Sequence, residues 1–263
     1  MPTPKYDIVV GVDFGTTASA IGYSSPLLGR PYYRPILIKQ PGIQNGAEKI
    51  PSVLTYTQDN PNLQERVWGF SAEYQPNAIS WFKLFLDGDN ENEIASWEAV
   101  TIHWARSLGI LSLPSGMSPI DVISDYLVAL KVSIWNHLKE KLTRADKSLE
   151  TSTIRFCFTI PGYWSQEAKD DMLIAIKRAG FGSRDCDNVC LLTESGAAII
   201  FALSNLRRGK GSLDLITGDG VLVCDCGGGT VDIASFLISE QDPLVYDQLT
   251  TSLDKLSISG SLG

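Results

Sequence analysis

The apolar positions of this chain form short runs that are separated by polar turns containing glycine. A continuous apolar run at 8–12 predicts a strand that is covered on both faces. A polar turn at 13–17 follows it, and alternating residues at 18–23 predict a strand that returns beside the first. Further short strands are expected at 35–39 and 52–56, where Pro and Gly punctuate the pattern without unfolding it.

The clearest helix is predicted between Ser118 and Leu142. Ser118 is a favoured N-cap residue, Pro119 suits the first helical position, and Asp121 suits the positive end of the helix dipole. Apolar residues then recur at steps of three and four, which places them on one face of the helix. These residues are Ile120, Ile123, Leu127, Leu130, Ile134, Leu138 and Leu142.

The second half of the chain alternates between strands and helices, which is typical of an α/β fold. The expected elements are strand 154–160, a helix capped by Ser165 and ending near Gly180, strand 189–192, helix 195–206, and strands 221–224 and 231–238. The Ser-, Leu- and Gly-rich sequence that follows predicts no closing element.

Composition and charge narrow the class of protein. With 263 residues, 44% hydrophobic and 20% charged, the chain has ordinary globular composition and can bury a core in one or two domains. Its net charge of −8 disfavours a general binder of nucleic acid or anionic membrane, because both need a basic face. No apolar run approaches the ~20 residues that a membrane-spanning helix needs.

The cysteines are odd in number, so they do not suggest a disulfide framework. We therefore expect a reducing compartment, the cytoplasm, with the nucleus as an alternative. Cys186 and Cys190 have a spacing that could suit a metal, but no second ligand pair follows, and we interpret them as free thiols. Cys224 and Cys226 should share one strand face, where packing would explain them. The five cysteines are Cys157, Cys186, Cys190, Cys224 and Cys226.

Two turns, at 13–17 and 225–230, carry the same candidate chemistry, because each joins an apolar strand to a returning strand. Glycines let backbone N–H groups approach phosphate oxygens without a Cβ clash, and threonine hydroxyls add further donors. An aspartate at the strand end can hold Mg²⁺ through water. Two such hairpins facing each other predict a site that grips a triphosphate from both sides, without the Walker pattern. The predicted phosphate contacts are Gly15, Thr16, Thr17, Gly227, Gly228, Gly229 and Thr230.

These motifs resemble those of the 70-kDa heat-shock chaperone family. Residues 10–19 look like the first phosphate motif of that family, and residues 223–232 look like the second. Residues 193–198 resemble the start of its connecting helix, and residues 158–164 resemble the segment before that helix. The resemblance covers nearly the whole chain and is closest to the atypical branch of the family. Shorter matches occur in the same order at 49–52 and 68–72.

The resemblance implies an actin-like ATPase fold, which is ribonuclease H-like. Residues 1–212 would form lobe I, with a small subdomain inserted at about 30–117, and residues 213–263 would begin a truncated lobe II. The adenosine-contacting segment, the closing helix of lobe I and the substrate-binding domain would all be missing. The strands of the second hairpin would then lack neighbours and leave an apolar face exposed.

The resemblance also implies roles for individual side chains. Asp13 and Asp225 would organise the hydration shell of Mg²⁺, with Asp225 also near the attacking water, and Asp232 would lie near this shell. Glu194 would hold a metal-bound or attacking water, and Lys83 would reach the γ-phosphate as the catalytic lysine of the family does. The residues around Lys83 depart from the Ala-Lys-Arg of the family, so a surface lysine on an apolar helix face is the alternative.

The function that the resemblance implies is ATP binding and Mg²⁺-dependent hydrolysis, coupled to protein folding. Unfolded client proteins and co-chaperones would be partners of the complete protein, and Pro161 would stand at the switch that relays nucleotide state to the substrate domain. A sugar or carboxylate kinase of the same fold is one alternative, and a truncated, non-catalytic interaction module is another. The present chain alone is expected to bind Mg·ATP weakly and to turn it over little or not at all.

Overall fold

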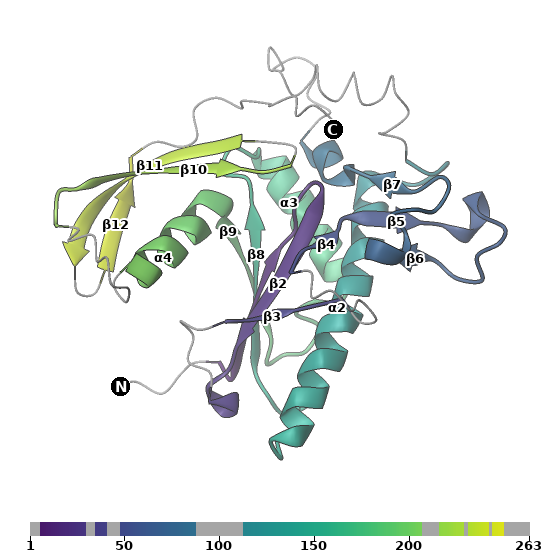
Figure 1. The fold of residues 1–263 in the computed structure, drawn as a ribbon, viewed down its shortest axis with the longest axis horizontal. Coiled ribbons are helices and arrows are strands. Elements are labelled where there is room, and N and C mark those ends of the chain that lie inside the picture. The colour runs from purple at the N-terminus through teal and green to yellow at the C-terminus, as the bar shows by residue number, and fades with distance from the viewer. Residues whose placement is uncertain are drawn as a thin grey trace, which may run out of the picture.

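The structure is a computed structural model that describes residues 6–29, 35–40, 48–87, 113–206, 216–228, 231–241 and 244–249. Gly229 and Thr230, which the sequence assigns to phosphate contact, lie outside these ranges. Strands and helices together form a mixed α/β architecture, shown in Figure 1. Within the described ranges, no helix has both the length and the apolar character needed to cross a bilayer.

The larger sheet has six strands in the order β3-β2-β1-β8-β9, with β4 paired to β2. β1 pairs antiparallel with β2 and parallel with β8, and β8 pairs parallel with β9. These pairings bring the end of β1 beside the ends of β8 and β9, and the candidate site described below lies at this edge. The strands are β1 (Ile8–Asp13), β2 (Ala18–Ser24), β3 (Ile36–Ile38), β4 (Ile50–Pro51), β8 (Ile154–Ile160) and β9 (Asn188–Thr193).

One face of this sheet forms the main core. Ile8, Val10 and Val12 of β1 are buried there, in one cluster with residues of helices α2 and α3. Gly11, on the opposite face of the same strand, is exposed. The expectation that β1 is covered on both faces is therefore wrong, because α2 and α3 both contribute to the core on one side (Figure 1).

The predicted helix signals are confirmed in α2 (Pro119–Arg144) and α3 (Gln166–Arg178). The Ser118 hydroxyl accepts a hydrogen bond from the Asp121 amide, and the Asp121 carboxylate accepts one from the Ser118 amide at 2.9 Å. This reciprocal capping box satisfies amides that have no partner within the helix. At the start of α3, the Ser165 hydroxyl accepts from the Ala168 amide at 3.1 Å.

A small three-stranded sheet follows β4 in the chain, in the order β6-β5-β7. It leads into the 3₁₀ helix η4, which contributes Lys83 to the candidate site. Trp81, directly before η4, has a left-handed φ of 61°, and Phe82, the first residue of η4, stacks on Phe14 with ring centres 6.0 Å apart. The elements are β5 (Val53–Thr55), β6 (Val67–Trp68), β7 (Ile79–Ser80), η1 (Pro26–Leu28), η2 (Thr57–Asp59), η3 (Gly69–Ser71) and η4 (Phe82–Leu86).

A second sheet is formed by β10 (Gly220–Cys226), β11 (Val231–Gln241) and β12 (Leu244–Gln248), all antiparallel. Helix α4 (Glu194–Leu206) lies along one face of this sheet, as Figure 1 shows. The sequence pattern missed β12, so the hairpin has one more strand than expected. The buried residues between helix and sheet are Ile199, Leu203, Ala234, Phe236 and Ile238.

Candidate functional site

The two glycine turns meet. Gly228 approaches Thr17 so closely that a Cβ on Gly228 would overlap the threonine hydroxyl. A Cβ on Gly15 would likewise overlap the backbone carbonyl of Ala18. These two positions therefore need glycine for steric reasons, and the turns that follow β1 and β10 lie against each other.

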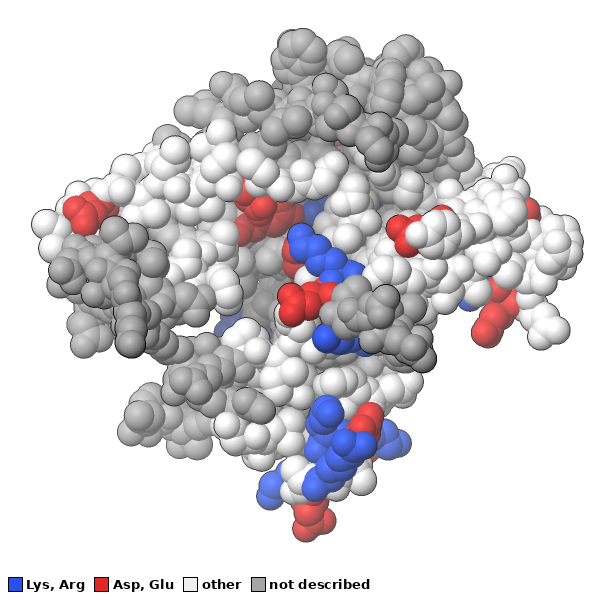
Figure 2. Space-filling view, viewed as in Figure 1, with Lys and Arg blue, Asp and Glu red and all other residues white. Residues whose placement is uncertain are grey.

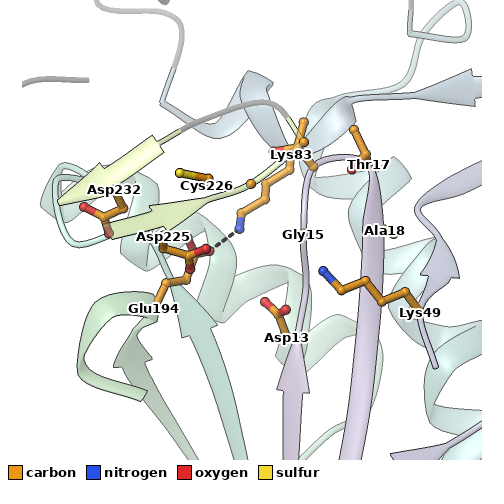
Figure 3. Close-up of a pocket in the computed structure, with 13 residues that line it drawn as sticks. Asp13, Gly15, Thr17, Ala18, Lys49, Lys83, Glu194, Asp225, Cys226 and Asp232 are labelled. Carbon is orange, nitrogen blue, oxygen red and sulfur yellow. Dashed lines mark hydrogen bonds and ion pairs between the residues drawn. The ribbon is translucent and has the colours of Figure 1, made fainter. Parts of the chain in front are cut away.

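A cavity of about 130 Å³ opens between the two turns (Figure 3). It brings together residues from β1, β2, η4, α4, β10 and β11, and Figure 2 shows acidic and basic side chains gathered in the hollow below β10 and β11. Four carboxylates and two lysines line the cavity. The lining residues are Asp13, Gly15, Thr16, Thr17, Ala18, Lys49, Lys83, Glu194, Asp225, Cys226, Gly227, Gly228 and Asp232.

Lys83 is buried and forms an ion pair with Glu194. Its Nζ lies 2.6 Å from Glu194 Oε1, and the residue is 4% exposed. The ammonium also lies 5.7 Å from the centre of the Phe14 ring and 5.5 Å from that of Trp164, within the range of a cation–π contact. The alternative of a surface lysine is therefore wrong, because the side chain points into the cavity and is paired there.

Asp13 and Asp232 are each held by the strand or loop beside them. Asp13 Oδ1 accepts a hydrogen bond from the hydroxyl of Thr159, its register partner on β8, at 2.9 Å. Asp232 is 3% exposed, and its Oδ2 accepts from the Gly162 amide at 3.4 Å. Its Oδ1 is buried and has no hydrogen-bond partner among the described residues. Asp225 lies opposite Asp232 in the β10–β11 ladder.

Burial and crowding of negative charge favour protonation of two of these carboxyls. Burial raises the pKa of Glu194, and the neighbouring Asp13 and Asp225 raise it further, although Lys83 lowers it. Burial also raises the pKa of Asp232, with Asp225 adding to the effect and the Gly162 amide opposing it. Excess negative charge of this kind is relieved by a bound cation.

The donor set suits a hydrated magnesium ion. No group of three or more Cys, His, Asp or Glu side chains converges as a metal cage within the described part of the chain. Mg²⁺ retains several waters and commonly takes only one or two protein carboxylates, so it does not need such a cage. The unpartnered Asp232 Oδ1 and the fixed Asp13 carboxylate fit this arrangement.

Of the cysteines, Cys226 lines the cavity and the other four do not. Cys190 Sγ lies 3.2 Å from Cys157 Sγ across β8 and β9, and both are free thiols, as is Cys186. Cys224 and Cys226 do share one face of β10, with their sulfurs 3.7 Å apart, but this face is exposed. Packing therefore does not explain these two cysteines, because α4 packs against the opposite face of β10.

The structure adds Lys49 to the site, a residue that was noted in the sequence only as part of a short family match. Lys49 directly precedes β4, which pairs with β2 immediately after the first glycine turn. The Ser52 amide donates to the Thr17 carbonyl at 2.9 Å, and the Ser52 hydroxyl donates to the Gly15 carbonyl at 2.7 Å. No local motif marks this lysine, because a pairing distant in sequence brings it to the cavity.

The known proteins that this chain resembles are heat-shock and chaperone proteins. No family model matches the chain. Human heat shock 70 kDa protein 12A is 24% identical over 86% of this chain, and human heat shock 70 kDa protein 12B is 26% identical over 87%. A chaperone protein HscA homolog from Rickettsia rickettsii is 23% identical over 96% of the chain. Over most of its length the chain is therefore similar, at about a quarter identity, to proteins of the 70-kDa heat-shock family.

The chain spans about two fifths of the length of the curated relatives that it matches, 40% of both human proteins and 36% of the Rickettsia protein. Of the residues that its sequence assigns to the site, all but Gly229 and Thr230 line the one cavity. The cavity therefore brings together both glycine turns with Lys83, Glu194, Asp225 and Asp232.

Proposed function

We propose that this chain binds Mg·ATP in the cavity between its two glycine turns, and that the complete protein hydrolyses ATP as a chaperone of the 70-kDa heat-shock type. The observation that carries the proposal is the contact of Gly228 with Thr17 above a cavity lined by four carboxylates and two lysines. Two phosphate-binding turns that meet in this way can hold a polyphosphate from both sides.

The cavity corresponds to the phosphate end of a nucleotide site. Its volume of about 130 Å³ is smaller than the roughly 300–1,000 Å³ of a site for a whole drug-sized ligand. Backbone amides of the turns at 15–17 and 227–228, with the hydroxyls of Thr16 and Thr17, would donate to phosphate oxygens. Gly229 and Thr230, which continue the second turn, would extend this set of donors.

Asp13, Asp225 and Asp232 would hold the magnesium ion through its water shell. When bound, Mg²⁺ would neutralise charge on the phosphates. Thr159 would keep the Asp13 carboxylate oriented, since its hydroxyl already donates to Oδ1 at 2.9 Å. The Gly162 amide would do the same for Asp232.

Glu194 and Lys83 are the best-placed residues for assisting hydrolysis. The Lys83 ammonium fixes one Glu194 oxygen at 2.6 Å, and the carboxylate would accept a hydrogen bond from the attacking water. Asp225, on strand β10, would orient the same water. The contribution of these residues would be positioning and electrostatic stabilisation, which dominate phosphoryl-transfer catalysis.

The complete protein would couple this site to client proteins and co-chaperones. The contact between the Gly162 amide and Asp232 joins the second phosphate hairpin to the segment of Pro161, which offers a short route for relaying nucleotide state. The free cysteines suit a reducing compartment, and we propose a cytoplasmic location.

Thermal unfolding in the presence of millimolar Mg·ATP tests nucleotide binding. A ligand at ten times its dissociation constant adds about 1.4 kcal/mol to the free energy of unfolding. For a chain of this size that is a rise of roughly 3–6 °C in Tm. Asp225→Asn should reduce the rise, whereas Asp185→Asn, an exposed carboxylate outside the cavity, should leave it unchanged.

The same measurement separates the proposal from the non-catalytic module. If Mg·ATP gives no stabilisation at any concentration while the chain unfolds cooperatively, nucleotide binding by this chain is refuted. Adenosine without phosphates should stabilise the chain far less than Mg·ATP, because the cavity offers contacts to the phosphate tail.

A further inference from the structure

Lys49 is the second cation that lines the cavity. Lys83 is committed to Glu194 at 2.6 Å, whereas Lys49 is exposed and forms no ion pair with any residue that the structure describes. Figure 3 shows its side chain lying alongside Ala18, with the ammonium turned toward the space above Asp13.

The backbone of Lys49 is fixed relative to the first glycine turn. Ile50 and Pro51 pair with Ser19 and Ala18 of β2, and Ser52 donates two hydrogen bonds, to the carbonyls of Thr17 and Gly15. The Tyr126 hydroxyl holds the Pro51 carbonyl from α2 at 3.1 Å. The lysine therefore emerges from a strand that is bonded directly to the predicted phosphate-binding turn.

The two lysines of the cavity differ in the contacts that they already make. The Lys83 ammonium already pairs with the Glu194 carboxylate, so only part of its donor capacity remains for a phosphate. Lys49 has no such competing contact. An ammonium is a compact point charge with three donors, which suits the oxygens of a phosphate.

We infer that Lys49 binds the polyphosphate of the nucleotide directly, in addition to the pair formed by Lys83 and Glu194. The inference rests on the proposed Mg·ATP site and adds a phosphate-binding residue that neither glycine motif contains. The ligand class is a nucleoside polyphosphate bound with a divalent cation. Inorganic triphosphate with Mg²⁺ would share the contact, since it presents the same oxygens.

The test compares Lys49→Gln, Lys49→Arg and Lys147→Gln in the 263-residue chain. Lys147 is an exposed lysine in the turn after α2 and lies outside the cavity. The apparent affinity for Mg·ATP is taken from the dependence of Tm on ligand concentration. Loss of one charge-assisted contact should weaken Mg·ATP about tenfold in Lys49→Gln, while Lys147→Gln remains at the wild-type value and Lys49→Arg retains most of the affinity.

Magnesium triphosphate is titrated in parallel and should show the same loss in Lys49→Gln. Because Lys49 is exposed, its substitution should leave the Tm of the ligand-free chain unchanged, so a weakened response cannot be ascribed to misfolding. Equal affinities for wild type, Lys49→Gln and Lys147→Gln would refute the role of Lys49 and leave the nucleotide site standing. A wild-type chain that does not respond to Mg·ATP would refute both.

Discussion

The contact between the two glycine turns can be tested with one added methyl group. In Gly228→Ala, the new Cβ would fall on the hydroxyl and methyl of Thr17, so one of the turns must move away. Overpacking of this kind costs about 1–3 kcal/mol, against a gain of about 0.4–1 kcal/mol from the smaller conformational freedom of alanine in the unfolded chain. We expect a net loss of about 1 kcal/mol, which lowers Tm by roughly 2–4 °C.

The effect on ligand binding should be larger than the effect on stability. The sheet that carries Gly228 has its own hydrophobic cluster with α4, separate from the cluster that contains β1. The strain at Gly228 can therefore be relieved by separating the turns without unfolding either cluster. Separated turns no longer present their amides to the same phosphates, so the stabilisation by Mg·ATP should be largely lost.

Gly220→Ala is the matched control. Gly220 begins the same strand β10, has an ordinary φ, and a Cβ placed there meets nothing within 4 Å. Its Tm should stay the same or rise slightly, and its response to Mg·ATP should equal that of the wild type. If both glycine variants match the wild type in Tm and in ligand response, close apposition of the two turns is not needed for the site.

Two further predictions concern polar groups that are partly shielded from solvent. Lys83→Met leaves the Glu194 carboxylate, whose side chain is 14% exposed, without its partner and should cost about 3 kcal/mol in urea unfolding. Adding Glu194→Gln should recover part of this; a double variant that is no better than the single one would contradict the pairing. Burial, with Lys141 nearby, lowers the pKa of His137, whose ring packs edge-on against Tyr23. The folded state thus favours the neutral ring, so the stabilising contribution of His137 is present above pH ~6.5 and is lost as the pH falls through the lowered pKa. In urea unfolding, the free energy of unfolding should fall less between pH 7.5 and pH 5.5 in His137→Gln than in the wild type.

The elements that the sequence predicted best depend on neighbours along the chain. The start of α2 follows from Ser118, Pro119 and Asp121, which satisfy one another within a single turn. The strand–turn–strand form of both hairpins is similarly local. For this reason the turns at 13–17 and 225–228 could be located before their contact in space was known.

Features that depend on tertiary contact were harder to predict. β12 is a five-residue strand whose sequence, Leu-Val-Tyr-Asp-Gln, places its apolar residues before its polar ones, so no alternation marks it. The open face of β1 was missed because Val9 and Gly11 read as part of a continuous apolar run, although the helices of the main core pack against the other face. An apolar run shows that a strand can be buried on both sides, and only packing decides whether it is.

The candidate site shows the same limit. The family motif assigned Lys83 to the site and the residue does line the cavity, but its burial and its pairing with Glu194, 111 positions away, depend on η4 and α4 meeting in space. Lys49 belongs to the short family match at 49–52, to which the sequence assigned no role, and its position at the cavity depends on the ladder between β4 and β2. A family signature identifies residues that many relatives share and does not identify a lysine brought in by backbone pairing.

The balance of charge in the cavity argues for a particular form of the proposed ligand. A site for a bare phosphate would need mainly donors and cations, because every carboxylate nearby repels the anion. Here four carboxylates face two lysines, and one of those lysines already pairs with Glu194. A polyphosphate can enter such a cavity only with a divalent cation between it and the aspartates. We therefore expect ATP without Mg²⁺ to stabilise the chain far less than Mg·ATP does, and equal stabilisation by the two would place the phosphates away from Asp13 and Asp225.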